Sequence, residues 1–154
     1  MMLEEVVTSE KGEEELEMPS FNHSYICWKI SQAVSKNEKF APLPELTLNI
    51  GNGITPDISV YPIEQVKPNF WHDIIRFPEM PILAIEIISV SQNIQDLIEK
   101  SQVLIDSGTK AVWTVEPFTN TVFVTTKEGK ERFHNQVVES EGITVDFRQI
   151  FATN

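Results

Sequence analysis

The eight residues 81–88, PILAIEII, are apolar at every position except Glu86. A short run of this kind is typical of a central strand whose two faces are both covered, so it predicts a sheet with packing on each side. A lone carboxylate in such a strand is costly to bury, so it takes up a proton or finds a partner. A metal, a cation or the mouth of a site would supply that partner, and a purely structural ion pair would do so equally well.

The stretch before this run predicts a hairpin. Residues 44–50, PELTLNI, alternate between apolar and polar side chains, which indicates a half-buried strand. Residues 51–53, Gly-Asn-Gly, predict a tight turn into a second strand at 54–61. The apolar side chains of that second strand fall on one face and Asp57 on the other. Pro56 lacks an N–H, which restricts the strand to an edge of the sheet or to a pairing that does not use this N–H.

The stretch after it predicts a helix over residues 94–107, with Lys100 on the flank of the apolar face, about 100° from its centre. If the two strands are neighbours and the helix packs on them, Asp57, Glu86 and Lys100 converge. Two carboxylates and a lysine are the minimum set for Mg²⁺-dependent hydrolysis of a phosphodiester. Judged alone, Lys100 could equally form a surface ion pair with Asp96, four residues earlier on the helix.

The remaining pattern predicts further helices and strands around this unit. Ser20 is a candidate N-cap for a helix that continues to about Ser35. The other predicted elements are strands at 110–116 and 121–126, a short strand ending at His134, a hairpin-like piece over 136–147, and a helical turn at 148–151. Residues 62–80 predict a long connection whose aromatic side chains (Phe70, Trp71, Phe77) fold it back over the core.

Three other groups could carry chemistry, and each has a simpler interpretation. His23 lies in the first helical turn without a His or Asp four residues later, which favours capping or packing over metal binding. Cys27, the single cysteine, fits a small buried hydrophobic residue. The run at 71–73, Trp-His-Asp, could hold a metal or stack a base, but a loop anchored by its aromatic side chains is the preferred interpretation.

Composition restricts the class of protein. A chain of 154 residues with 41% hydrophobic residues predicts one globular domain, here 19–154, preceded by an acidic tail at 1–18. No apolar run is long enough to span a membrane and no signal peptide is evident, so we expect a cytoplasmic protein. The net charge is −11, of which residues 1–18 carry −6. This charge excludes a large phosphate-binding surface, so any affinity for nucleic acid requires a local patch or a metal.

The order of these motifs resembles the Uma family of proposed restriction endonucleases, which is common in cyanobacteria and belongs to the PD-(D/E)XK nuclease superfamily. The resemblance covers roughly residues 20–151. It is carried by Pro-Asp in a strand, the segment IEIISVSQN, the helical segment DLIEK and the segment GTKAVWTVEP. It implies an α/β (α+β) fold of the restriction-endonuclease type, with a mixed central sheet flanked by helices.

The resemblance also implies a set of site residues. Asp57 and Glu86 would bind Mg²⁺ or Mn²⁺, together with the backbone carbonyl of Ile87. The usual superfamily lysine stands two residues after the Glu, where this chain has Ile88. The family pattern moves the lysine to the following helix, which corresponds to Lys100.

The chain differs from the family pattern at two further places, and two more residues are candidates for the site. The family usually has Tyr four residues after the lysine, where this chain has Leu104, and Gly-Val-x-Glu-Tyr-Trp, where this chain has GTKAVW at 108–113. Ser89 and Asp96 are candidates for orienting the metal ligands without binding the metal themselves.

The function implied is hydrolysis of DNA, with Lys100 orienting a water or stabilising negative charge. A homodimer is expected only because many nucleases of the superfamily cut two strands in that way. Two alternatives stay open: a catalytically silent interaction module with the same fold, and a nuclease that is active only with a partner.

Overall fold

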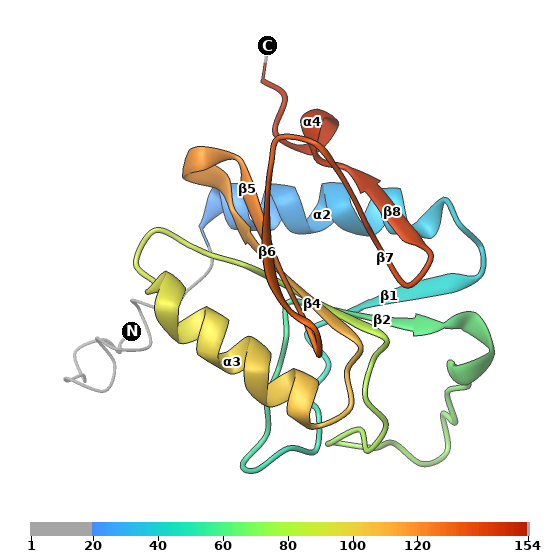
Figure 1. The fold of residues 1–154 in the computed structure, drawn as a ribbon. Coiled ribbons are helices and arrows are strands. Elements are labelled where there is room, and N and C mark those ends of the chain that lie inside the picture. The colour runs from blue at the N-terminus through green and yellow to red at the C-terminus, as the bar shows by residue number, and fades with distance from the viewer. Residues whose placement is uncertain (1–19, 154) are drawn as a thin grey trace, which may run out of the picture.

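The computed structural model describes residues 20–153, so the predicted acidic tail at 1–18 lies outside the described residues. The domain is built on a six-stranded sheet in which sequence order and spatial order coincide, β1-β2-β3-β4-β5-β6 (Figure 1). The strands are β1 (Phe40–Pro44), β2 (Ile58–Pro62), β3 (Leu83–Ile87), β4 (Ala111–Glu116), β5 (Thr121–Thr126) and β6 (Gly129–His134).

The apolar run at 81–88 forms β3, which lies inside the sheet between β2 and β4. Every residue of β3 is buried, as its composition predicts. β3 and β4 are parallel, and the helix α3 (Ile94–Asp106) connects them, whereas all other neighbouring strands of this sheet are antiparallel. A parallel pair needs such a crossover connection. The prediction of a mixed central sheet flanked by helices is therefore confirmed.

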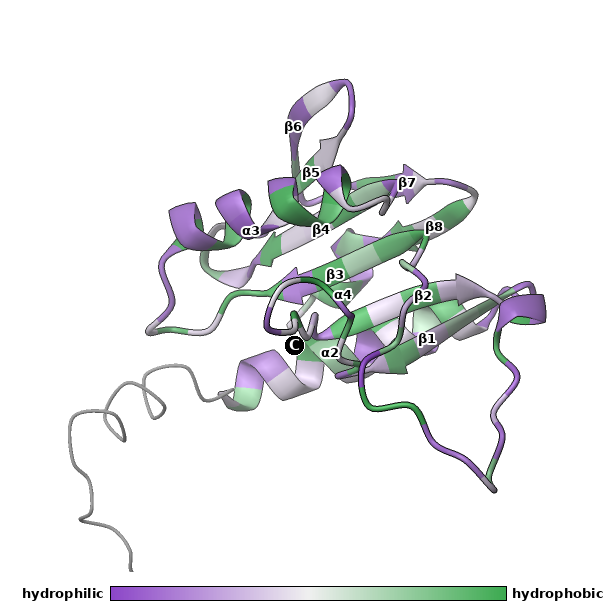
Figure 2. Cartoon of the chain, turned by 90° about the horizontal axis from the view of Figure 1, so that it is seen from below, coloured by the Kyte–Doolittle hydropathy of each residue, from purple (hydrophilic) through white to green (hydrophobic). Residues whose placement is uncertain are grey.

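Two layers cover the two faces of the sheet (Figure 1). The larger core lies between the sheet and the helix α2 (Phe21–Ser35), together with a small second sheet of β7 (Val137–Ser140) and β8 (Ile143–Asp146) and the short helix α4 (Phe147–Ile150). A smaller core lies on the opposite face, beneath α3. Hydrophobic colouring concentrates on the central strands between these two layers (Figure 2).

Local sequence signals explain where the two long helices begin and end. Ser20 caps α2 by accepting a hydrogen bond from the backbone N–H of His23 at 3.2 Å, as predicted. Asn93 caps α3 in the same way, accepting from the N–H of Gln95 at 2.8 Å. Gly108 follows α3 with φ +121°, a backbone conformation that glycine adopts without steric cost.

The predicted hairpin of strands 44–50 and 54–61 is wrong in its pairing. On one side β2 pairs with the earlier strand β1, with Phe40 opposite Pro62. Of the predicted hairpin only the single antiparallel bridge between Leu48 and Ile54 forms, and Leu48 makes a second isolated bridge with Phe77. Leu48 is fully buried in the smaller core, so burial under α3, not a strand ladder, explains the alternation. Because β2 begins after Pro56, the missing N–H does not confine it to an edge, and β2 is an internal strand.

The predicted folding of the loop 66–80 over the core is correct for only one of its three aromatic residues. Phe77 packs edge-on against Tyr61, with ring centroids 5.5 Å apart. Phe70 and Trp71 are 94% and 98% exposed, so they do not anchor the loop.

The C-terminal predictions agree with the structure. The turn between β4 and β5 is a single 3-10 turn, η2 (Pro117–Thr119), and a second such turn, η1 (Ile63–Gln65), follows β2. The predicted hairpin-like piece is the pair β7–β8, and the predicted helical turn is α4. No helix within residues 20–153 is both long and apolar enough to cross a membrane.

Candidate active site

The register of β2 against β3 brings the first two predicted site residues together. Ile58 lies opposite Ile85 in this antiparallel pair, so Asp57, one residue earlier, falls opposite Glu86. Residues directly opposite one another in an antiparallel pair project from the same face of the sheet. Ala84, two residues before Glu86, projects from the same face of β3, as does its partner Val112 on β4. Both belong to the core beneath α3, so this is the face that α3 covers.

Lys100 reaches this point from α3. Its Nζ lies 2.6 Å from Oε2 of Glu86, with the lysine side chain 31% exposed and the glutamate side chain 5% exposed. Oε2 is buried, and apart from this ion pair it has no hydrogen-bond partner among residues 20–153. The surface pair with Asp96 does not form, so the structure decides between the two interpretations of Lys100 in favour of convergence with Glu86.

The electrostatics of Glu86 follow from its position between a positive and a negative side chain. Burial raises the pKa of Glu86 to about 7, the positive charge of Lys100 opposes the rise, and the negative charge of Asp57 adds to it. A hydrogen bond to Asp57 further favours the protonated form. The carboxyl group is therefore held near the balance between its two protonation states, and any further cation would favour the carboxylate.

This raised pKa predicts a pH-dependent stability. Between pH 4.5 and about 7 the folded state keeps a proton on Glu86 that the unfolded chain has released. The free energy of unfolding is therefore expected to fall as the pH rises through this window, with a contribution on the order of 3 kcal/mol. The measurement is chemical denaturation at a series of pH values for the wild type and for Glu86→Gln. Parallel curves for the two proteins would contradict the assignment.

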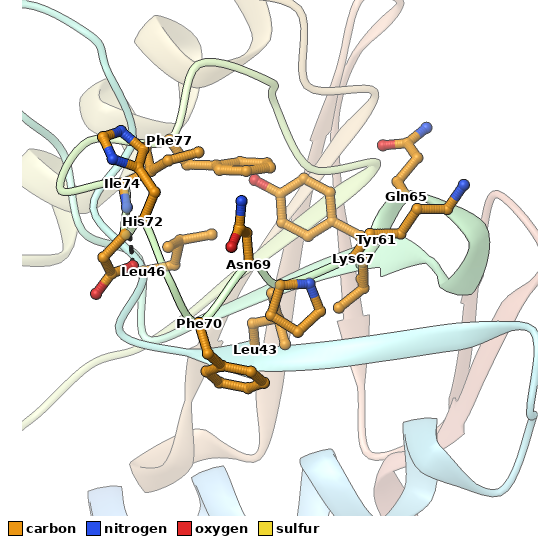
Figure 3. Close-up of a pocket in the computed structure, with 13 residues that line it drawn as sticks. Leu43, Leu46, Tyr61, Gln65, Lys67, Asn69, Phe70, His72, Ile74 and Phe77 are labelled. Carbon is orange, nitrogen blue, oxygen red and sulfur yellow. Dashed lines mark hydrogen bonds between the residues drawn. The ribbon is translucent and has the colours of Figure 1, made fainter.

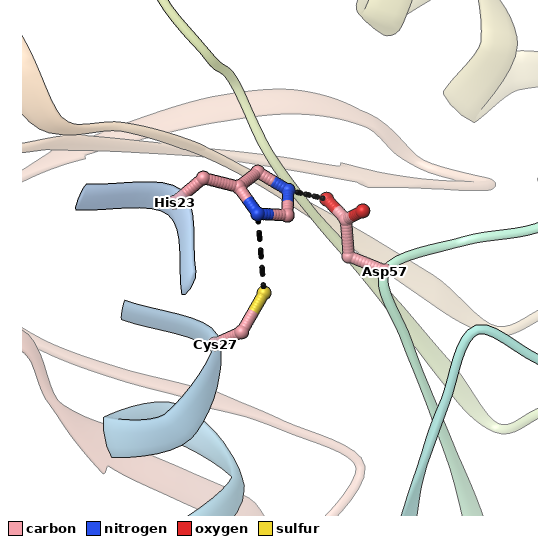
Figure 4. A group of neighbouring side chains, drawn as sticks. All are labelled: His23, Cys27 and Asp57. Atoms are coloured by element: carbon pink, nitrogen blue, oxygen red, sulfur yellow. Dashed lines mark hydrogen bonds and ion pairs between the residues drawn. The ribbon is translucent and has the colours of Figure 1, made fainter. Parts of the chain in front are cut away.

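Asp57 makes two contacts that the sequence did not indicate. Its Oδ2 accepts a hydrogen bond from the backbone N–H of Ile87 at 2.8 Å and lies 3.0 Å from Nε2 of His23 (Figure 4). The hydrogen bond to Asp57 raises the pKa of His23 to about 10, the contact with Cys27 adds to the rise, and burial opposes it. His23 is therefore an imidazolium paired with Asp57 at neutral pH.

His23 thus does more than the capping or packing role preferred from the sequence. Its backbone takes part in the N-cap of α2, its ring is buried, and its Nδ1 lies 3.8 Å from Sγ of Cys27. Cys27 is half-buried and packs against the main core, which agrees with the prediction of a hydrophobic role but adds a polar contact. The signal was present in the sequence: Cys27 stands four residues after His23, on the same side of the helix.

Comparison with known proteins assigns the chain to a family. The family model of Uma2, described as "Putative restriction endonuclease", matches residues 10–153. The chain belongs to the Uma2 family. A search of curated proteins gave no match.

The fold of this Uma2 chain resembles that of a solved structure. The crystal structure described as "a putative nuclease belonging to DUF820 from Anabaena variabilis ATCC 29413" aligns with a TM-score of 0.75 and 24% sequence identity over 87% of this chain and 82% of its own. The two chains therefore share one fold, a mixed central sheet flanked by helices. The structure of the DrdV-DNA complex aligns with a TM-score of 0.45 and 12% identity over 68% of this chain and 9% of its own.

The other predicted residues of the Uma2 site lie around the pair Asp57–Glu86 without joining it. Ser89 is buried, and its N–H and Oγ both donate to Oε1 of Gln92 at 2.9 and 3.2 Å. This contact orders the loop between β3 and α3. Asp96 is exposed in the first turn of α3. The supporting role predicted for Ser89 and Asp96 stays a prediction.

A separate pocket lies under the loop 66–77 and includes none of the three predicted catalytic residues (Figure 3). Its volume is about 350 Å³, and its lining includes Tyr61, Phe70, His72, Asp73 and Phe77. His72 and Asp73 do not belong to a metal-binding group among the described residues, and Asp73 instead accepts a hydrogen bond from the N–H of Ile74 at 2.8 Å. The metal interpretation of Trp-His-Asp therefore receives no support.

Proposed function

We propose that this chain is a Mg²⁺-dependent endonuclease that hydrolyses phosphodiester bonds of DNA. The observation that carries the proposal is the buried carboxyl group of Glu86, which lies between Asp57 and the ammonium of Lys100 on neighbouring elements. The family description supports the reaction class. A nuclease also explains why a central strand retains a carboxylate that a purely structural strand would replace with an apolar residue.

The donor set fits a hard divalent cation. Mg²⁺ binds oxygen ligands and is usually held by one or two carboxylates, with water and substrate phosphate in the other positions. The contacts of Asp57 with His23 and Ile87 both use Oδ2, and a cation bound between Asp57 and Glu86 would replace the hydrogen bond between these two side chains. The ammonium of Lys100 is the one ion-pair partner of Glu86 among residues 20–153. The backbone carbonyl of Ile87 is the third proposed ligand, and Mn²⁺ would serve as a substitute.

Each residue then has a defined role. Asp57 and Glu86 would hold the cation, and the hydrogen bond from the N–H of Ile87 fixes the orientation of Asp57. Bound there, Mg²⁺ would supply a water of lowered pKa and neutralise charge on the scissile phosphate. Lys100 is the catalytic residue whose partly exposed ammonium can donate to that water or to a phosphate oxygen. Ser89 supports the site indirectly by ordering the loop after β3.

The proposed partners follow from the same reaction. The substrate would be DNA, and a second copy of the chain would serve the cleavage of the second strand. The cation would offset the repulsion between the two carboxylates and the phosphates, which matters for a protein with a net charge of −11. A cytoplasmic location would bring the protein to such a substrate.

Two observations favour a second candidate, a silent interaction module. The net charge of −11 opposes binding to a polyanion, and the ion pair between His23 and Asp57 already satisfies one of the two carboxylates without a metal. A nuclease that depends on a partner for its positive surface is the third possibility. Cleavage of DNA by the purified protein excludes the silent module, and cleavage only in the presence of a partner supports the third possibility.

Isothermal titration of Mn²⁺ tests the metal site directly. The wild type is expected to bind Mn²⁺, and Asp57→Asn, which keeps the shape of the side chain but loses its charge, is expected to lose at least about tenfold in affinity. Asp106→Asn is the matched control, because this carboxylate is exposed at the end of α3 and contacts only Gln102 among the described residues. A folded wild type that binds no Mn²⁺ would overturn the proposal.

A further inference from the structure

A second group of potential ligands lies on the other side of Asp57. One ligand atom each from His23, Cys27 and Asp57 lies within 4.8 Å of the other two, which is the one such His/Cys/Asp/Glu group among residues 20–153 (Figure 4). His23 and Cys27 are four residues apart on α2, so both project from the same side of the helix toward Asp57. Asp57 therefore belongs both to this group and to the pair that it forms with Glu86.

The group borders an open pocket, so solvent and ions can reach it. The pocket has a volume of about 260 Å³, and His23, Cys27 and Asp57 all contribute to its lining, together with Ser24 and Glu45. A site formed by three protein ligands next to open space leaves a fourth coordination position for water.

The chemistry of the three ligands differs from that of the Asp57–Glu86 pair. An imidazole, a thiolate and a carboxylate form a borderline-soft set, which selects Zn²⁺ and similar transition metals, whereas oxygen ligands alone select Mg²⁺. We propose that His23, Cys27 and Asp57 form a second metal site, for Zn²⁺ or a similar divalent transition metal, that shares Asp57 with the Mg²⁺ site.

Closing this site requires a reorientation of the His23 imidazole, although all three ligand atoms already lie within 4.8 Å of one another. Ligand atoms around a tetrahedral Zn²⁺ lie roughly 3.3–3.8 Å apart, as bond lengths of about 2.0–2.3 Å require. The contact between Nε2 of His23 and Oδ2 of Asp57 is already 3.0 Å, and that between Nδ1 and Sγ of Cys27 is 3.8 Å. Asp57 faces Nε2 of the imidazole and Cys27 faces Nδ1, and one imidazole binds an ion through a single nitrogen. The ring of His23 must therefore turn until one nitrogen faces both other ligands, and His23 and Cys27 must release their protons.

Sharing Asp57 gives the site a regulatory consequence. An ion bound by His23, Cys27 and Asp57 withdraws Asp57 from the Mg²⁺ site, so the two metals would compete. Zn²⁺ would therefore inhibit cleavage that Mg²⁺ supports. This consequence rests on the proposed function, but the binding of the transition metal does not, because Glu86 takes no part in it.

Titration of the metal-free full-length protein with Co²⁺ tests the site through an absorption signal that only a thiolate ligand produces. The wild type is expected to show the near-ultraviolet sulfur-to-cobalt charge-transfer band, and added Zn²⁺ is expected to remove it. Cys27→Ser is expected to lose the band and to bind Zn²⁺ at least about tenfold more weakly. His23→Gln is expected to weaken Zn²⁺ binding by a similar factor.

Glu86→Gln is the control that separates this proposal from the proposed function. It removes a ligand of the Mg²⁺ site and leaves all three ligands of the transition-metal site, so the cobalt–thiolate band is expected to stay unchanged. Circular dichroism would establish that each variant is folded. A wild type without the band, or equal Zn²⁺ affinity in the wild type and Cys27→Ser, would overturn the second site whether or not DNA is cleaved.

Discussion

Glu86→Gln is expected to reduce Mg²⁺-dependent DNA cleavage by about 10³-fold or more while the protein stays folded. The substitution keeps the size of the side chain but removes the charge that holds the cation, and a bound metal ion contributes several kcal/mol to the transition state. The measurement is the rate of nicking of plasmid DNA by the purified protein at saturating Mg²⁺.

The free energy of unfolding of Glu86→Gln shows whether a loss of activity reflects a loss of folding. Removing one partner of a buried ion pair usually destabilises a protein, because the other charge stays buried and unpaired. Lys100 is 31% exposed and can be hydrated, so the free energy of unfolding of Glu86→Gln at pH 8 is expected to equal or exceed that of the wild type. Glu99→Gln, an exposed glutamate on α3, is the matched variant that should keep full activity. Full activity in folded Glu86→Gln would refute the proposed role.

Trp113→Ala is expected to produce the largest loss of stability, about 3–5 kcal/mol. Trp113 is the largest fully buried side chain, its ring packs edge-on against Phe147 at 5.7 Å, and its Nε1 donates a hydrogen bond to Oγ of Ser140 at 2.8 Å. It therefore joins the central sheet to α4 and β7. Denaturant unfolding monitored by circular dichroism measures the loss.

Two further variants separate the contributions to this loss. Trp71→Ala removes an equally large side chain that is 98% exposed, so its effect is expected to stay within about 0.5 kcal/mol. Ser140→Ala removes the hydrogen-bond acceptor of the Trp113 indole and is expected to cost about 1–3 kcal/mol, since the N–H stays buried. Similar losses for Trp113→Ala and Trp71→Ala would contradict the assignment of the core.

The convergence of Asp57, Glu86 and Lys100 was predictable because each part of the pattern is local. The apolar run around Glu86 dictates a covered strand, and the helical periodicity after it places Lys100 on the flank of the packed face. The chain then needs only a crossover from β3 to β4 for α3 to lie over the strands. The catalytic role of the three residues is a separate matter and stays a proposal.

The predicted hairpin failed because alternation reports burial of every second residue and not the identity of the strand partner. Leu48 is buried as its pattern requires, but it is covered by the loop segment around Phe77 and by the core under α3. The true partner of β2 is β1, whose sequence, FAPLP, contains two prolines and so gives a weak strand signal. Edge strands tolerate proline, because one row of their backbone groups faces solvent.

The sequence by itself determined the central strand, the two capped helices, the alternation of buried residues and the presence of a carboxylate that needs a partner. These features follow from periodicity and from the chemistry of single residues, which act over a few positions of the chain. Only the tertiary structure decided that Lys100 pairs with Glu86 and not with Asp96, and that His23 and Cys27 lie beside Asp57. Such contacts join elements that are distant in the sequence, and the register between strands and the packing of helices on the sheet determine them.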